Sequence, residues 1–100
     1  MDKTLAKGAD YALRVKGDSM EPHLLESDLV WVKKTQAAES GEIVVAHVGD
    51  DEATGSEATV KCFRRTRNSV WLEATNPKYK PIQGPFRIIG KVLGLVRKYR

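Results

Sequence analysis

The sequence has little of several features that would assign the protein to particular classes. Its single cysteine, Cys62, excludes an internal disulfide and fits a reducing compartment. No run approaches the roughly 20 apolar residues that a membrane-spanning helix needs, and the first residues lack the apolar core of a secretory signal. With 100 residues, the chain has room for one domain with one core. We therefore expect a single cytoplasmic domain over residues 1–100, with no membrane partner, or a fragment of a cytoplasmic protein.

The excess of one sign of charge is small, and few residues are of the types that bind metals. Seventeen basic against 13 acidic residues give a net charge of +4, which permits an acidic partner without requiring one. One cysteine and two distant histidines, His23 and His47, offer no metal-ligand spacing, so we predict neither a metal nor a cofactor. Basic clusters at turn ends are usually solvated, which makes direct DNA binding by this chain the weaker interpretation. Those clusters are Lys33-Lys34, Arg64-Arg65-Arg67 and Arg97-Lys98-Arg100.

The sequence does contain a succession of short β-branched and aromatic segments. In the first of them Tyr11, Leu13 and Val15 alternate with more polar residues, the period-2 pattern of a half-buried strand. No window of 11 or more residues keeps a helical stripe. The pattern predicts an all-β fold, a compact, highly twisted, partly open barrel or sandwich of about six or seven short strands. The predicted strands are 10–16, 29–32, 43–48, 58–63, 70–74 and 86–96.

Four details refine this prediction. Residues 43–48 are almost continuously apolar, which indicates a central strand covered on both faces. The acidic, glycine-punctuated stretch 49–57 is typical of a long, mobile hairpin loop. Residues 23–27 fit one irregular or helical turn. In the last strand, Gly90 and Gly94 suggest a bend or a bulge.

One serine and one lysine form the most reactive pair that the sequence offers. Ser19 lies in the turn Lys16–Pro22, and a serine hydroxyl needs a base to become a nucleophile at neutral pH. Lys61 sits between apolar residues of a predicted strand, where burial would lower its pKa and make it such a base. On residue types alone, a serine that caps a turn and a lysine that faces solvent are the commoner explanations.

Other arrangements are weaker. A Ser-His-Asp set would combine Ser19 with His23 or His47 and with Asp18 or Asp28. Cys62 is the other candidate nucleophile. It follows Lys61 in the predicted strand and so points to the opposite face, which favours a thiol buried in the core over a reactive one.

Five separate blocks of the chain follow one another in an order that is typical of a known family. They are 13–20 (LRVKGDSM), 28–30 (DLV), 34–36 (KTQ), 41–46 (GEIVVA) and 59–61 (TVK). These blocks resemble the C-terminal peptidase domain of LexA-type repressors and of their UmuD and phage-repressor relatives. The match runs from about Gly8 to Val96, and residues 86–96 resemble the closing strand of that family.

This resemblance implies a serine–lysine peptidase that cuts its own chain. Ser19 is similar to the family nucleophile and Lys61 to its general base. Thr59 matches the hydroxyl that orients the lysine, and the backbone N–H groups of Asp18 and Ser19 match the oxyanion hole. The resemblance also implies a homodimer formed through this domain and stimulation by an activated RecA filament. Its biological role would be repression in the SOS response or in a phage.

The chain departs from the family pattern in four respects. It lacks the N-terminal helix-turn-helix domain through which family repressors bind DNA, and it lacks the Ala-Gly or Cys-Gly pair of the self-cleavage segment, so we expect a cleaved product or a trimmed catalytic domain. Ser27-Asp28 replaces the usual Gly-Asp, which questions a tight glycine turn there. The hairpin over 49–57 is longer than in LexA itself.

Three alternatives remain beside the repressor. One is a UmuD-like mutagenesis subunit, and another is a non-catalytic dimerisation or binding module on the same fold. Bacterial signal peptidases share a Ser-Met motif and a downstream lysine on a related fold, but they need a membrane anchor, which we do not expect here.

Overall fold

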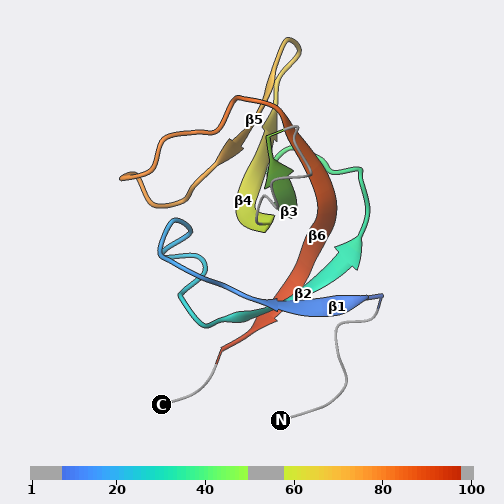
Figure 1. The fold of residues 1–100 in the computed structure, drawn as a ribbon, viewed down its shortest axis with the longest axis vertical. Helices are drawn as coiled ribbons and strands as arrows, with labels where there is room; N and C mark the ends of the chain where they lie inside the picture. Colours follow the sequence, from blue (N-terminus) through green and yellow to red (C-terminus); the bar gives the residue numbers. More distant parts are fainter. Residues whose placement is uncertain (1–7, 50–57, 98–100) are drawn as a thin grey trace.

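Six β-strands form one antiparallel sheet in the computed structural model, which describes residues 8–49 and 58–97 (Figure 1). The all-β prediction is confirmed, and strand ends differ from the predicted ones by at most two residues. Within the described residues, nothing helical has the length and apolarity to cross a membrane. Most of the predicted mobile loop, 50–57, lies outside the described residues. The strands are β1 (Tyr11–Arg14), β2 (Leu29–Lys34), β3 (Ile43–Val48), β4 (Ala58–Arg65), β5 (Val70–Glu73) and β6 (Phe86–Val96).

The order of strands across the sheet explains how distant segments come together. It is β1-β2-β6-β3-β4-β5, with every neighbouring pair antiparallel. The long, curved β6 therefore joins a β1–β2 half to a β3–β4–β5 half, and the two halves run in clearly different directions (Figure 1). Strong twist of this kind is typical of sheets that curl toward a barrel. The result is a sheet that remains open between its two halves.

Two apolar clusters use opposite faces of β3. Val45 packs into the first cluster, and its neighbours Val44 and Ala46 pack into the second, because successive side chains of a strand point to opposite faces. The prediction that this strand is covered on both faces is confirmed. The buried members of the first cluster are Val15, Met20, Leu24, Val30, Val32 and Val45, and those of the second are Val44, Ala46, Phe63, Leu72 and Ile88.

The glycines of β6 mark two irregularities, as predicted. The register of β6 shifts once against β2, next to Gly94, and once against β3, next to Gly90. A Cβ atom on Gly90 would lie 2.5 Å from Cγ1 of Val32, which is closer than such atoms approach. Glycine is therefore required where β6 crosses β2 at close range, and the bulges give β6 its curvature.

The turn before β2 stays tight although it lacks the glycine that the family resemblance suggested. Ser27 adopts a φ of 78°, in the left-handed region that favours glycine. Its N–H donates to the carbonyl of Val15 at 2.9 Å, and its carbonyl accepts from Arg14 at 3.0 Å. Just upstream, the N–H of Leu24 donates to the carbonyl of Met20 at 2.9 Å and closes a turn over 20–24, which overlaps the irregular or helical turn predicted for 23–27.

Candidate active site

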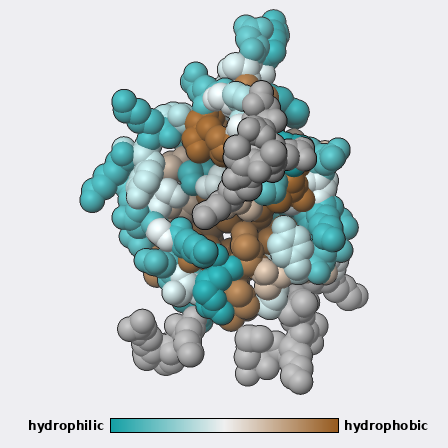
Figure 2. Space-filling view, viewed as in Figure 1, coloured by the Kyte–Doolittle hydropathy of each residue, from teal (hydrophilic) through white to brown (hydrophobic). Residues whose placement is uncertain are grey.

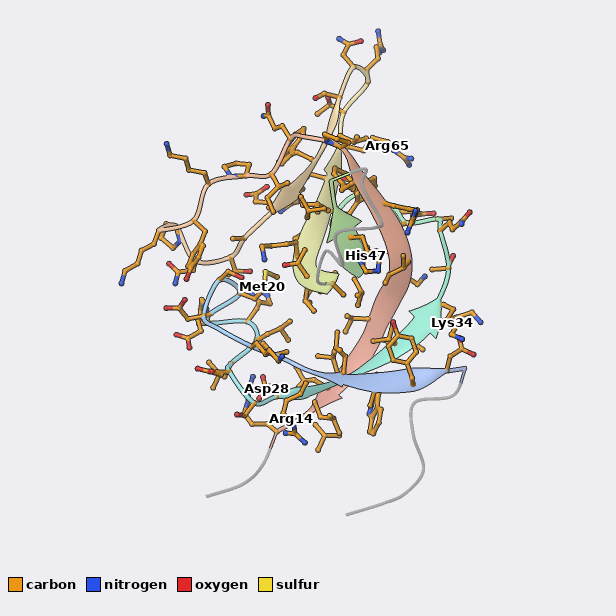
Figure 3. All side chains as sticks on the ribbon, viewed as in Figure 1. Arg14, Met20, Asp28, Lys34, His47 and Arg65 are labelled. Carbon is orange, nitrogen blue, oxygen red and sulfur yellow. The ribbon has the colours of Figure 1, made fainter. Side chains whose placement is uncertain are left out.

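The open side of the curled sheet forms a cleft that contains Ser19 and Lys61. Its walls are residues 13–16, at and just after the end of β1, and residues 58–61 of β4. Three strands separate β1 from β4 within the sheet. The cleft has a volume of about 480 Å³. Ser19 follows β1 in the loop to β2, and Met20, the next residue, points from that loop toward the interior (Figure 3). Burial of Met20 in the first core anchors the loop beside β4.

The amine of Lys61 lies at the centre of three polar contacts. Its Nζ atom is 3.0 Å from Oγ of Ser19, 2.7 Å from Oγ1 of Thr59 and 3.3 Å from the carbonyl oxygen of Val60. A neutral amine has two N–H donors and one lone pair. Thr59 and Val60 can take the two donors, which leaves the lone pair for the hydroxyl proton of Ser19. The contact set therefore suits a neutral Lys61 that acts as a base toward Ser19.

Burial supports the same protonation state. Only 8% of Lys61 is exposed, and desolvation lowers the pKa of its amine from the ordinary value of 10.5. Within residues 8–49 and 58–97, no carboxylate forms an ion pair with Lys61 that would oppose this effect. The environment thus disfavours the ammonium form, as a general base requires.

The N–H groups expected to form the oxyanion hole lie in the same loop. In the described part of the chain, neither the N–H of Asp18 nor that of Ser19 donates a hydrogen bond. A second hollow, of about 320 Å³, adjoins them and is lined by residues from Lys16 to Ser19, by Lys61 and by the loop after β5. Both groups are therefore free to bind an oxygen atom of a ligand.

The loop after β5 contributes residues that sequence reasoning missed. The Nδ2 of Asn76 donates to the carbonyl of Asp18 at 3.0 Å, and its backbone N–H donates to the carbonyl of Ser19 at 2.9 Å. The hydroxyl of Tyr79 donates to Oδ1 of Asp18. No pattern in the sequence linked this loop to a turn almost 60 residues earlier.

The competing arrangements are not assembled. Among the described residues, the hydroxyl of Ser19 bonds to Lys61 and to neither histidine. His47 lies in β3, opposite Ala58 and Arg87, and His23 is exposed beside a different hollow. Asp28, the other candidate acid, accepts two hydrogen bonds from Arg97, at 2.9 and 2.7 Å. No group of His, Cys, Asp or Glu in the described chain could hold a metal.

Two further expectations need adjustment. Cys62 packs against the first core as predicted, but it is partly rather than fully buried. Of the basic clusters, Arg64 pairs with Glu73 and Arg97 with Asp28, so these two side chains are engaged within the protein. Residues 98 and 100 of the last cluster lie outside the described residues.

A family model decides the relationship. The model named Peptidase S24-like matches residues 1–93, which is nearly the whole chain. The chain belongs to the Peptidase S24-like family. The resemblance inferred from the sequence blocks is thereby confirmed, and the family relates this domain to self-cleaving peptidases and repressor-type proteins.

Proposed function

We propose that this chain is the self-cleaving serine–lysine peptidase domain of a LexA-like repressor, with Ser19 as nucleophile and Lys61 as general base. The observation that carries the proposal is the 3.0 Å contact between the Ser19 hydroxyl and a buried lysine amine whose pKa burial lowers. Thr59 orients that amine through its 2.7 Å hydrogen bond. The N–H groups of Asp18 and Ser19 serve as the oxyanion hole.

The reaction follows from these roles. Neutral Lys61 accepts the hydroxyl proton while Oγ of Ser19 bonds to the carbonyl carbon of the scissile peptide, and the two N–H groups stabilise the oxyanion. The intermediate collapses, the C–N bond breaks, and Lys61 returns the proton to the leaving amine. A water molecule then attacks the acyl ester, with Lys61 again as base, and releases the carboxylic acid product and Ser19.

The strands around the cleft are suited to a peptide substrate. β1 is an edge strand of the sheet, and β5 pairs only with residues 62–65 of β4, so the segment 58–61 has no neighbouring strand on the cleft side within the described residues. Unpaired strand edges bind extended peptides by adding a strand. Figure 2 shows hydrophobic residues in the middle of this face of the molecule and hydrophilic residues around them. Such a surface suits the apolar side chains of a bound peptide.

The regulatory part of the proposal concerns partners. We propose that the domain forms a homodimer through β6, whose apolar side chains Leu93 and Leu95 are 38% and 39% exposed. An activated RecA filament would favour the cleavage-competent conformation, and DNA would be bound only through a separate N-terminal domain. The role is then control of SOS or phage genes in the cytoplasm.

A cleavage assay in trans tests the proposed chemistry. A peptide with the family's Ala-Gly bond is supplied to the wild type and to the Ser19→Ala and Lys61→Ala variants, at neutral and at raised pH. The wild type should cleave faster as the pH rises, because deprotonated Lys61 becomes available, and both variants should be inactive. Equal turnover by all three proteins would refute the peptidase and favour a non-catalytic binding module.

A further inference from the structure

Asn76 makes more contacts with the nucleophile loop than a spacer residue would. It donates from Nδ2 to the carbonyl of Asp18 and from its backbone N–H to the carbonyl of Ser19, at 3.0 and 2.9 Å. Its Oδ1 accepts from the N–H of Lys78 at 3.0 Å, which fixes the side chain's own orientation. The residue is partly buried and is held in place at three points.

The two carbonyls belong to the two peptide groups that flank the Cα atom of Ser19. A trans peptide group is planar, and its C=O and N–H point in opposite directions. The cis bond of this loop is at Glu21-Pro22, so the Asp18-Ser19 peptide is trans. A hydrogen bond that holds the carbonyl of Asp18 toward Asn76 therefore directs the N–H of Ser19 away from Asn76. That N–H is one of the two proposed oxyanion donors.

We infer that Asn76 is a positioning residue that orients the oxyanion hole by holding both peptide groups of Ser19. Because the two planes determine the backbone dihedral angles of Ser19, they also set the direction of its Cα–Cβ bond. One residue thus restrains both the Cα–Cβ bond that carries the nucleophilic hydroxyl and the N–H that would stabilise the oxyanion. The inference rests on the proposed peptidase function and adds a residue that does not touch the substrate.

Neighbouring contacts of the same loop provide a natural control. Tyr79 also bonds to Asp18, but to its carboxylate, so it restrains a side chain and no peptide group. Thr75 contacts the sulfur of Met20 at 3.8 Å, which likewise leaves the peptide planes untouched. If the loop acted only as a brace, losing Tyr79 or Asn76 should have similar effects on the reaction.

The test compares Asn76→Asp with Tyr79→Phe in the Ala-Gly peptide assay. Asn76→Asp keeps the size of the side chain and the acceptor for Lys78, but it replaces the donor to Asp18 with an oxygen that repels that carbonyl. We expect kcat to fall by about 10²-fold with KM within about twofold, as for loss of an oxyanion donor. Tyr79→Phe should keep kcat within about threefold. The pH at which the rate rises should be unchanged in Tyr79→Phe and in the uncharged variant Asn76→Ser, since neither adds a charge near Lys61.

The outcomes separate this inference from the proposed function. A wild type that does not cleave counts against the peptidase itself. A wild type that cleaves, beside an Asn76→Asp protein with the same kcat or with a loss confined to KM, overturns the inference alone. Asn76→Ser, which retains a short acceptor for Lys78 but cannot reach Asp18, repeats the test if the aspartate variant does not fold.

A measurement on the wild-type protein tests the inference without requiring that any variant folds. Phosphonylation of Ser19 places a phosphoryl oxygen, which carries partial negative charge, where the oxyanion would form. The amide proton signal of Ser19 in NMR spectra should then move downfield as that N–H donates to the oxygen. A Ser19 amide signal that stays in place after phosphonylation overturns the inference.

Discussion

Asp28 and Lys61 are the two buried ionisable side chains of the described domain, and they lie in different chemical settings. Their exposed fractions are 2% and 8%, and both have a lowered pKa. Asp28 lies at the end of the β1–β2 loop, near Arg14, whereas the Ser19 end of that loop lies by β4 (Figure 3). The same direction of shift has opposite meanings for an acid and for a base.

For Asp28, the lower pKa means a stabilised charge. The guanidinium of Arg97 donates two hydrogen bonds to it, and the N–H of Leu25 adds a third at 2.8 Å. These bonds lower the pKa of the carboxyl against the opposing effect of burial. Because the folded pKa lies below 3.8, the stabilisation is present above that pH and is lost as the pH falls through the folded value.

For Lys61, the lower pKa means a destabilised charge. Burial alone causes the shift, and its hydrogen-bond partners are a hydroxyl of Ser19, a hydroxyl of Thr59 and a carbonyl. A cation that served only stability would gain from a carboxylate partner such as the one that Arg97 has. The comparison teaches that pairing distinguishes a buried charge that is stabilised by its partner from a buried amine that is free to serve as the proposed base.

The largest expected effect comes from removing the unpaired base. Lys61→Met keeps an unbranched side chain of similar length and should lower peptide cleavage by at least about 10⁴-fold, as removal of a unit of a catalytic dyad does. The free energy of unfolding at neutral pH should equal or exceed that of the wild type, because no buried amine must be desolvated. Cleavage kinetics and urea denaturation measure the two quantities.

The pH dependence of the stability difference between the wild type and Lys61→Met serves as a control. Between the lowered pKa of folded Lys61 and 10.5, the unfolded chain binds more protons than the folded one, so wild-type stability rises with pH in that window. Any stability advantage of Lys61→Met should therefore shrink as the pH approaches 10.5. An advantage that grows instead would mean that folded Lys61 is the stabilised ammonium.

Removing the paired charge should have the converse effect on stability. Asp28→Asn keeps the shape but loses the charge-assisted bonds to Arg97, and we expect the free energy of unfolding to fall by about 2 kcal/mol. The matched control is Glu73→Gln, at an ion pair with Arg64 whose side chains are 43% and 45% exposed. That change should stay within about 0.5 kcal/mol. Equal effects of the two substitutions in urea denaturation would remove the distinction between buried and exposed pairs.

A smaller effect should come from the backbone next to Asp28. Ser27→Gly places glycine at a φ of 78° and should raise the free energy of unfolding by about 0.5–1 kcal/mol, since relief of the left-handed strain exceeds the added entropy of the unfolded chain. Thermal unfolding measures it, with cleavage kinetics unchanged. A lower melting temperature would show that the serine side chain contributes more than the strain removes.

The fold was largely predictable from the sequence because its strands follow local patterns. Alternation over 11–14 and the apolar run 43–48 determine which side chains are buried, and Gly90 marks a close crossing that excludes a Cβ atom. Strand order was not predictable, since β6 inserts between β2 and β3 through pairing over about 40 to 70 residues. Such pairing leaves no local signal.

The candidate site was predictable to a similar extent. Ser19 and Lys61 could be singled out because a turn serine and a lysine among apolar residues carry recognisable chemistry, and the family blocks gave their pairing. Asn76 and Arg97 could not, since asparagine and arginine near loop or strand ends are usually solvated. Their partners lie 58 and 69 residues away and meet them only in the folded chain.

The central claim, that Lys61 is the base for Ser19, is tested most directly by two titrations of the wild-type domain. One follows the amine of Lys61 by NMR, and the other follows the rate at which a phosphonylating reagent labels Ser19. We predict one shared pKa, below 10.5, with labelling that rises with pH through it and that disappears in Lys61→Met. An amine that titrates at or above 10.5, or labelling that is independent of its titration, would contradict the claim.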